Sequence, residues 1–271
     1  MSQREGQHMG FFDKFSRVWP GGYFEGNPLD PMAVSSFGVY GYNSVLYTVY
    51  LACIRNYVNS RTTVLEIGPG RGAWTRTFLE RGCKKVYAVD AAPAEHTGFW
   101  DYVGVTDRAE YIASTDLTLS GVPDDSVDYF FSFGVFCHLK PEMCETYLTS
   151  LAKKMRAGSH AFLMIADYDK YNYCLDNADR LSIKRFFASR KVWLPARLAY
   201  SFTWKCFRSK ADMRRVSKSD DLDLSRDADT TRWYHWGVDR ACAAIKKEGF
   251  QIVEQDTEVV ARDPVIHFAK L

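Results

Sequence analysis

The sequence predicts an α/β fold: a doubly wound sheet of seven strands, mostly parallel, with an antiparallel C-terminal strand, an N-terminal arm and a helical lid insertion. Three observations indicate this fold. Short apolar runs alternate with helical stretches between residues 63 and 166, a glycine-rich turn follows the first run, and two further apolar runs close the chain. Strands that alternate with helices favour right-handed βαβ units and therefore a parallel sheet.

The composition is that of a globular protein in a reducing compartment. Of the 271 residues, 46% are hydrophobic and 25% are charged, which excludes a disordered chain. The seven cysteines contain no C-x-x-C pair, which argues against a disulfide framework or a structural zinc site. The most apolar run, Val45 to Ile54, is about half of the roughly 20 residues that cross a bilayer, and no signal segment is visible. We therefore expect a cytoplasmic protein without a transmembrane segment.

Each strand and helix is expected from a run of one periodicity between turn signals. Strands are expected at 63–67, 85–90, 110–115, 127–133 and 160–166. Helices are expected at 43–59 with Asn43 or Ser44 as the N-cap, after the glycine-rich turn to about Arg81, at 141–156, and at 233–248. Gly158 is expected to separate the third helix from the fifth strand. A tight turn at Arg262-Asp263-Pro264 is expected to join strands 250–260 and 264–270 into an antiparallel hairpin.

The chain divides into a core and two additions. Residues 1–60 are expected to form the arm and a capping helix, residues 61–175 with 231–271 the core, and residues 176–230 a basic helical lid. Within this lid, residues 180–218 hold twelve Lys or Arg and one acid, Asp212, with aromatic residues between them. Such a lid suits a phosphorylated or nucleotide-linked sugar, a glycolipid at a membrane surface, or RNA. The alternative is a solvated face that the acids at 220–229 partly neutralise.

The glycine-rich turn is the first candidate binding element. Gly68-Pro69-Gly70-Arg71-Gly72 joins a buried strand to a helix. Glycines let a ligand approach the main chain without a Cβ in the way, and the helix N-terminus behind them favours an anion. Asp90 closes the second strand, where an acid binds ribose hydroxyls. Dinucleotides and sulfonium nucleosides are both bound in this way, and the glycine spacing separates the two classes only weakly.

Further motifs follow this turn in a fixed order. Glu66, the glycine turn and Asp90 are followed by Thr115-Asp116-Leu117, by Pro123 to Tyr129, by Ser132 to Leu139, and by Ala157-Gly158-Ser159 before a strand. Taken together, these motifs resemble those of the class I, Rossmann-like S-adenosylmethionine-dependent methyltransferases over residues 62–170. The segment Leu65 to Trp74 is most similar to that of bacterial enzymes that methylate sugars or other small molecules.

The resemblance implies S-adenosylmethionine as the cofactor and a set of residues that bind it. In the family, the acid at Asp90 binds the ribose and the acid at Asp116 meets the adenine amino group. For Trp74, the alternative to ligand contact is a packing role. The implied cofactor-binding residues are Glu66, Gly68, Gly70, Gly72, Trp74, Asp90, Ala91, Asp116, Leu117 and Phe133.

The expected reaction is O-methylation of a sugar or a small hydroxylated metabolite, free or linked to an anionic glycoconjugate. A hydroxyl needs a base within hydrogen-bonding reach, and a neutral histidine is the usual one. His138 follows the fourth strand at the carboxyl edge of the sheet, and His235 opens the expected helix after the lid. A cofactor-shell role for His138 and an aromatic packing role for His235 are the alternatives. Asp167 and Asp169 alone cannot complete an octahedral metal site, and no metal is expected.

Two other activities stay open. N-methylation of a small amine needs only desolvation and orientation, and methylation of RNA or ribose could use the basic lid. The Asp/Asn-Pro-Pro-Tyr/Phe signature of base methylation is absent, since Ser132-Phe133-Gly134-Val135 stands in its place. A small-molecule acceptor is therefore the expected partner and nucleic acid is not. Peripheral membrane contact stays open, and the sequence does not indicate the oligomeric state.

Overall fold

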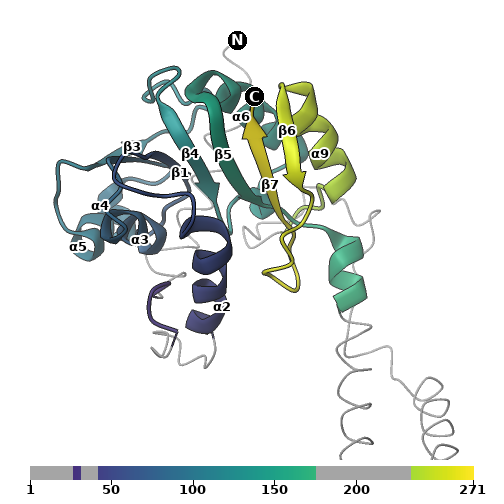
Figure 1. The fold of residues 1–271 in the computed structure, drawn as a ribbon, viewed down its shortest axis with the longest axis horizontal. Coiled ribbons are helices and arrows are strands. Elements are labelled where there is room, and N and C mark those ends of the chain that lie inside the picture. Colours follow the sequence, from purple (N-terminus) through teal and green to yellow (C-terminus); the bar gives the residue numbers. More distant parts are fainter. Residues whose placement is uncertain (1–26, 32–41, 175–232) are drawn as a thin grey trace, which may run out of the picture.

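A computed structural model describes residues 27–31, 42–174 and 233–271 of the chain (Figure 1). Its centre is one sheet of seven strands in the order β3-β2-β1-β4-β5-β7-β6. β1 to β5 are mutually parallel, and β7 runs antiparallel to both of its neighbours, β5 and β6. The predicted fold class is confirmed, including the antiparallel strand near the C-terminus.

The strands follow the apolar runs of the sequence. They are β1 (Thr63–Ile67), β2 (Lys85–Asp90), β3 (Ala109–Ala113), β4 (Val127–Ser132), β5 (Met155–Met164), β6 (Phe250–Glu254) and β7 (Val265–Lys270). β1 is buried along its whole length, because helices cover both faces of a doubly wound sheet. The parallel strands end at one edge of the sheet, where the candidate ligand-binding residues lie.

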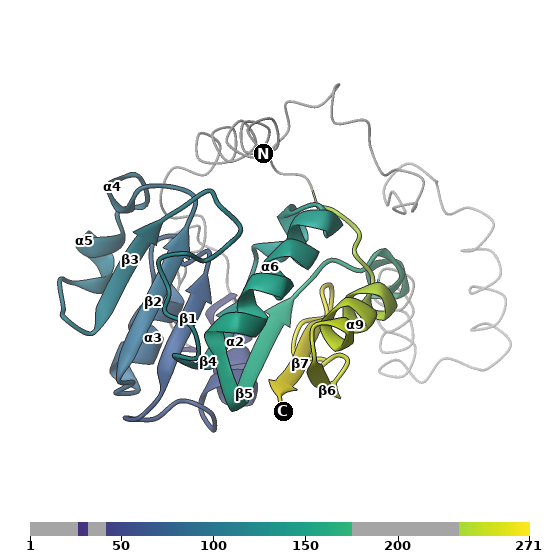
Figure 2. The ribbon, with the colours of Figure 1, turned by 90° about the horizontal axis from the view of Figure 1, so that it is seen from above.

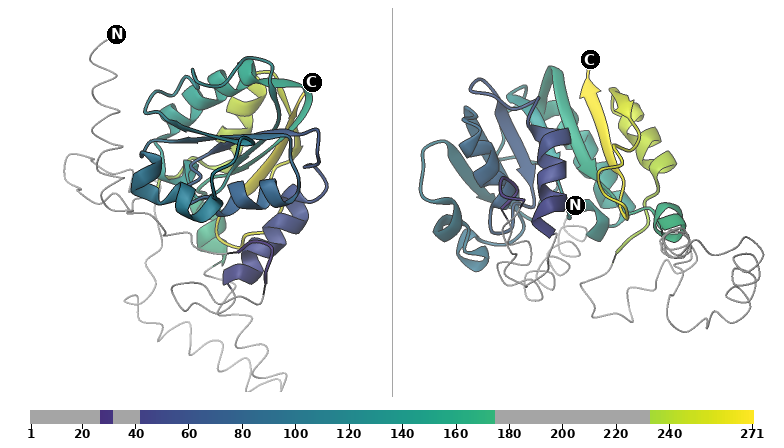
Figure 3. Two further views of the ribbon diagram at one scale, coloured as in Figure 1. Left: turned by 90° about the vertical axis from the view of Figure 1, so that its left-hand side faces the viewer. Right: turned by 60° about the horizontal axis from the view of Figure 1, so that its bottom comes forward.

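Helices cover both faces and form three layers with the sheet (Figures 2 and 3). They are α2 (Tyr42–Val49), η1 (Tyr50–Ile54), α3 (Ala73–Glu80), α4 (Ala94–Thr97), α5 (Phe99–Val103), η2 (Phe136–His138), α6 (Pro141–Lys154) and α9 (Val238–Lys247). α6 and α9 pack on the face that carries Leu65, Phe130 and Leu163. α2, η1, α3 and α5 pack on the other face, which carries Val64, Phe131 and Phe162.

Two expected boundaries in the C-terminal half were wrong. β5 begins at Met155 directly after α6, and Gly158 lies inside the strand at φ +79°, because Met155 pairs with Val127 and draws the chain into the sheet at once. β6 ends at Glu254, so residues 255–264 form a long connection to β7 where a tight turn was expected. Asp256 holds this connection, since its Oδ1 accepts from the amides of Glu258 (3.0 Å) and Val265 (3.3 Å).

Two expected helices also differ from the structure. The helix expected at 233–248 begins only at Val238, so residues 233–237 form no regular secondary structure and His235 precedes the helix. The helix expected at 43–59 begins at Tyr42 and continues as the π-helical turn η1 to Ile54, so neither Asn43 nor Ser44 is its N-cap. Within the described residues, no helix is long and apolar enough to cross a membrane. The expected lid, residues 176–230, lies wholly outside the described residues, as does most of the arm.

Candidate active site

The glycine-rich turn is held by packing at its ends and is open at its centre. Gly68, Gly70 and Gly72 all have positive φ, at +74°, +54° and +100°. A Cβ on Gly68 would lie 2.0 Å from Val135 Cγ2, and one on Gly72 would lie 2.3 Å from Val103 Cγ2. A Cβ on Gly70 would meet nothing within 4 Å. The outer glycines therefore admit neighbouring side chains, whereas Gly70 leaves open space above the main chain for a ligand.

Asp90 joins this turn to the second strand. Its Oδ2 accepts from the amide of Gly70 (3.1 Å) and its Oδ1 from the amide of Ala92 (3.0 Å). Burial raises the pKa of Asp90, and the backbone amides of Ala92, Gly70 and Ala91 oppose that rise. Oδ2 accepts from the Gly70 amide and Oδ1 from the Ala92 amide, and each oxygen keeps further acceptor capacity. The carboxylate is thus fixed beside the turn and can still accept from the hydroxyls of a ribose.

Glu66 is a buried carboxyl group with one oxygen unfilled. Its side chain is 1% exposed, and its Oε2 accepts from Thr75 Oγ1 (2.5 Å). Its Oε1 has no hydrogen-bond partner among the described residues. Burial raises the pKa of Glu66 to about 8, the Thr75 hydroxyl opposes the rise, and the charge of Asp90 adds to it. A buried unfilled acceptor suits a cationic donor, and the ammonium group of a methionine moiety is one.

The third motif forms a loop that holds its own acid. Asp116 is exposed, and its oxygens accept from the Thr118 amide (2.9 Å), the Thr118 hydroxyl (2.8 Å) and the Ser120 hydroxyl (2.9 Å). Burial acts to raise the pKa of Asp116, but these hydrogen bonds outweigh it and lower the pKa. Leu117 is buried in the core beneath, and Ala91 packs against the same cluster.

Trp74 and Phe133 lie in one aromatic cluster. Trp74 is 6% exposed, and its ring centroid lies 5.1 Å from that of Phe131 and 5.3 Å from that of Phe133. Phe133 is half-buried, directly after β4. The packing alternative therefore accounts for the contacts of Trp74, while Phe133 lies closer to solvent at the carboxyl edge.

The two candidate histidines approach the same edge from different segments. His138 ends η2, which follows β4. Segment 233–237 is hydrogen-bonded to the residues that follow β4 and β5, because the Tyr234 amide donates to Cys137 O (2.8 Å) and the Trp236 amide to Ala166 O (3.1 Å). Both imidazoles are half-buried. The structure thus brings His138 and His235 to the end of the sheet where the glycine turn and Asp90 lie.

The hydrogen bonds of His235 set its tautomer. Its Nδ1 accepts from the backbone amide of Tyr168 (3.1 Å), so the neutral ring carries its hydrogen on Nε2. The ring centroid lies 4.9 Å from that of Tyr168, and a Cβ on Gly237 would lie 3.0 Å from Nε2. His235 can therefore donate from Nε2, but in this tautomer it cannot accept a proton there.

Asp263 is a buried acid that the sequence analysis treated only as part of a turn. It is 1% exposed, and it accepts from Trp233 Nε1 (2.9 Å) and Arg262 Nε (2.6 Å). Burial raises its pKa, and the charges of Arg262 and His138 with the Trp233 hydrogen bond oppose that rise. The sequence signal was an Arg-Asp pair directly before a strand. The negative charge of Asp263 therefore acts on His138.

Asp167 caps two helices. Its Oδ1 accepts from the amides of Asp169 (2.8 Å) and Lys170 (3.1 Å) at the start of helical residues 168–174, and its Oδ2 accepts from the Val238 amide (2.9 Å) at the start of α9. These backbone bonds lower the pKa of Asp167, although burial acts to raise it. Among the residues that the structure describes, no three His, Cys, Asp or Glu side chains form a group that could hold a metal ion.

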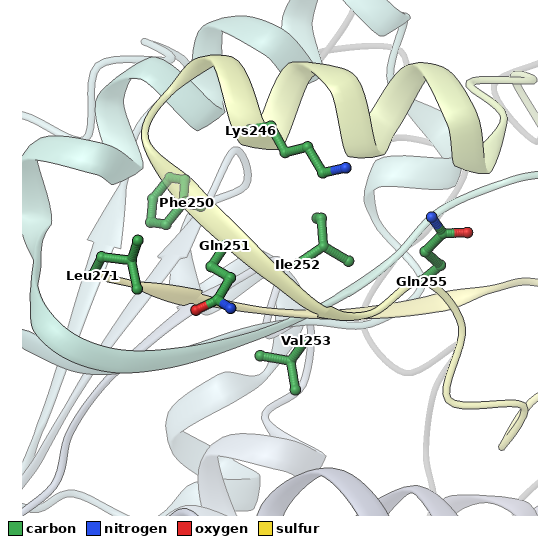
Figure 4. A pocket seen from close by; sticks show the side chains of 7 residues that line it. All are labelled: Lys246, Phe250, Gln251, Ile252, Val253, Gln255 and Leu271. Carbon is green, nitrogen blue, oxygen red and sulfur yellow. The ribbon is translucent and has the colours of Figure 1, made fainter.

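A groove beside the edge strand β6 lies apart from this site (Figure 4). It lies along β6 and α9, has a volume of about 600 Å³, and is lined by Lys246, Phe250, Gln251, Ile252, Val253, Gln255 and Leu271. β6 is separated from β1 by three strands, β4, β5 and β7. The groove therefore has no part in the arrangement around the glycine turn.

The chain belongs to the methyltransferase domain family, whose model matches residues 49–224. No curated protein matches the chain. Among solved structures, it is similar to a putative S-adenosylmethionine-dependent methyltransferase from Listeria monocytogenes (13% identity over 84% of this chain and 98% of that one, TM-score 0.51). It is also similar to the mitomycin 7-O-methyltransferase MmcR (14% identity over 85% of this chain and 55% of that one, TM-score 0.51). At these identities the solved structures show a shared fold alone.

Family membership makes the protein a methyltransferase, and S-adenosylmethionine is its cofactor. The residues present fit this group in two respects: the space above Gly70 is open, and Oε1 of Glu66 is a buried acceptor without a partner among the described residues. The expected cofactor and the expected class of enzyme are therefore confirmed.

Proposed function

We propose that this methyltransferase acts on a hydroxyl group of a sugar or another small hydroxylated metabolite, with His138 as the general base. The observation that carries the proposal is the position of His138, which ends η2 at the carboxyl edge of the sheet, where the buried charge of Asp263 acts on it. A nearby carboxylate favours the imidazolium form. It would therefore stabilise the protonated state that His138 reaches when it takes a proton.

The chemistry requires little else of the protein. S-adenosylmethionine supplies the methyl group as an electrophilic sulfonium when it is bound. The chain then has to hold the acceptor oxygen in line, exclude water and remove one proton. His138 accepts that proton as the hydroxyl oxygen attacks. Tyr234 and Trp236, on either side of His235, are buried, and we propose that they help to exclude water from this edge.

We assign His235 a different role from the one expected for it. Because Nδ1 is occupied by the Tyr168 amide, the neutral ring offers Nε2–H, which can orient an oxygen of the acceptor but cannot remove its proton. The two histidines would then act together, His138 as the base and His235 as a donor.

On the cofactor side, Asp90 is proposed to bind the ribose, Glu66 the ammonium group, and Gly70 to let the methionine moiety pass close to the main chain. Gly68 and Gly72 shape the turn through their contacts with Val135 and Val103. Asp116, Leu117 and Ala91 are proposed to border the adenine, and Phe133 with Trp74 to border the site toward the acceptor. We also propose a cytoplasmic location, which the free thiols of the six described cysteines support.

The test is to incubate the protein with methyl-labelled cofactor and panels of sugars, sugar phosphates, small amines and short RNAs. We expect label in a base-stable methyl ether of a hydroxylated acceptor. His138→Asn should lower kcat by about 100- to 10,000-fold, whereas His96→Asn, which changes an exposed histidine on α4, should not. Transfer to an amine or to RNA only, or an unchanged kcat in His138→Asn, would refute the proposal.

A further inference from the structure

The hydroxyl of Thr75 is buried against the carboxyl group of Glu66. Thr75 lies in the first turn of α3 and is 0% exposed, and Glu66 in β1 is 1% exposed. The hydroxyl donates to Oε2 over 2.5 Å. Hydrogen bonds in a low-dielectric interior are stronger than those in water. This bond therefore fixes the orientation of the Glu66 carboxyl group before any ligand binds.

That orientation decides which oxygen stays available. Oε1 is buried, and no described residue donates to it. Glu66 lies two residues before Gly68, and its carboxyl group is close enough to Asp90 for the charge of Asp90 to act on it. Leaving a buried acceptor unfilled costs free energy. The fold thus keeps one carboxyl oxygen in reserve beside the glycine-rich turn.

We propose that Thr75 is a positioning residue for S-adenosylmethionine, because it holds Oε2 of Glu66 and so keeps Oε1 for the ammonium group of the cofactor. This inference rests on the proposed role of Glu66 in cofactor binding. Thr75 acts through Glu66 and does not touch the reacting atoms.

The proposal has a consequence for protons. Burial raises the pKa of Glu66 to about 8, while the Thr75 hydroxyl opposes the rise. At neutral pH the empty site is therefore largely protonated, and an ammonium group that binds at Oε1 displaces this proton to the solvent. Affinity should increase as the pH rises toward the pKa of Glu66. Without the Thr75 hydroxyl the pKa rises further, so affinity at neutral pH falls and the increase moves to higher pH.

Thr77 provides a matched control in the same helix. It is 1% exposed, and its hydroxyl donates to the carbonyl of Ala73 (2.9 Å), within α3 itself. Thr75→Val and Thr77→Val each remove one buried hydroxyl from α3 and keep the shape of the side chain. They differ in whether the lost hydrogen bond reached Glu66.

The experiment is calorimetric titration of the full chain with S-adenosylhomocysteine, in two buffers of different ionisation enthalpy, between about pH 6 and pH 8.5. We expect Thr75→Val to weaken binding about tenfold or more at neutral pH and to move the pH dependence upward. Thr77→Val and Thr75→Ser should bind like the wild type, which releases a proton on binding. Equal affinities and equal pH profiles for Thr75→Val and Thr77→Val would overturn the inference.

Two further outcomes keep the result decisive. Should Thr75→Val fail to fold, Glu66→Gln takes its place. A neutral amide cannot release a proton, so we expect no proton release from this variant on binding. Proton release that persists in Glu66→Gln would overturn the inference. A wild-type protein that binds S-adenosylhomocysteine while both Thr75→Val and Thr77→Val match it would refute the role of Thr75 alone. A wild-type protein that does not bind would instead refute the proposed cofactor site.

Discussion

The backbone amide of Gly70 donates to Oδ2 of Asp90 over 3.1 Å. This bond joins the centre of the glycine turn to the end of β2, and a second bond, from the Gly68 amide to Val89 O (2.8 Å), joins the start of the turn to the same strand. The turn is therefore set against β2 by its own backbone. A site that is formed in advance binds its ligand with less loss of conformational entropy.

Asp90 should be essential for cofactor binding. S-adenosylhomocysteine at 100 times its Kd should stabilise the wild-type protein by about 2.7 kcal/mol, seen as a higher Tm. In Asp90→Ala this shift should vanish, because the ribose loses its acceptor and the Gly70 amide loses its anchor. Asp101→Ala, which changes an exposed acid on α5, is the control. A full shift in Asp90→Ala, or a shift produced by NAD, would contradict the assignment.

Gly68 and Gly70 should fail for different reasons when each is replaced by alanine. In Gly68→Ala the positive φ carries the same cost as at Gly70 and the new Cβ would also lie 2.0 Å from Val135 Cγ2, so the clash should remove roughly 1–3 kcal/mol beyond the cost of the positive φ. Val135→Ala in the same chain should restore part of this additional loss. Gly70→Ala meets no atom, so it should cost only about 1–2 kcal/mol for its positive φ and should mainly lower cofactor affinity. Urea unfolding and calorimetric titration separate the two effects. Equal losses of stability in both variants would contradict the packing role assigned to Gly68.

The sequence predicted the elements around the cofactor well because their signals are local. β1 and β2 end at Ile67 and Asp90 as expected, since a glycine turn stops the first apolar run and an acid stops the second. Parallel strands then bring Glu66, Gly70 and Asp90 to one edge. Local sequence signals were therefore enough to place these residues together.

The boundaries that failed depend on partners far along the chain. α9 starts at Val238 because Asp167 accepts from its amide, 71 residues away in sequence, and no local pattern shows this bond. The bond from Thr75 to Glu66 could have been suspected, since a threonine on the buried face of a helix needs an acceptor. Which acceptor it meets follows only from the packing of α3 on β1.

Asp263 should set the pH dependence of catalysis through His138. Asp263→Asn removes a negative charge that acts on His138 and favours the imidazolium form, so the acid limb of the kcat profile should move to lower pH. The Asn amide can keep the hydrogen bond with Trp233, and Arg262, whose side chain is 53% exposed, can be solvated. Asp239→Asn, an exposed change on α9, should leave the profile in place. An acid limb that does not move in Asp263→Asn would remove Asp263 from the mechanism.

His160 and His267 should make the fold sensitive to acid. Across the β5–β7 pair, His160 Nδ1 lies 3.0 Å from His267 Nε2, and Tyr57 packs against both rings. Burial and then the neighbouring His160 lower the pKa of His267 to about 4, and burial lowers that of His160. Two imidazoles at this distance share one hydrogen, so both can be neutral in the folded state but not both protonated.

The sign of the pH effect follows from these lowered values. Between about pH 6.5 and pH 4 the unfolded chain binds more protons at these histidines than the folded one, so the stabilisation is complete above pH 6.5 and is lost as the pH falls. A loss on the order of 2–3 kcal/mol is expected from this pair. His267→Gln keeps a polar partner for His160 and should flatten the dependence of the unfolding free energy on pH over this window, measured by urea unfolding, whereas His96→Gln should not. An equally steep loss in His267→Gln over this window would show that the histidine pair does not cause the acid sensitivity, because a carboxyl group with a lowered pKa, such as Asp167, loses its contribution mainly below about pH 4.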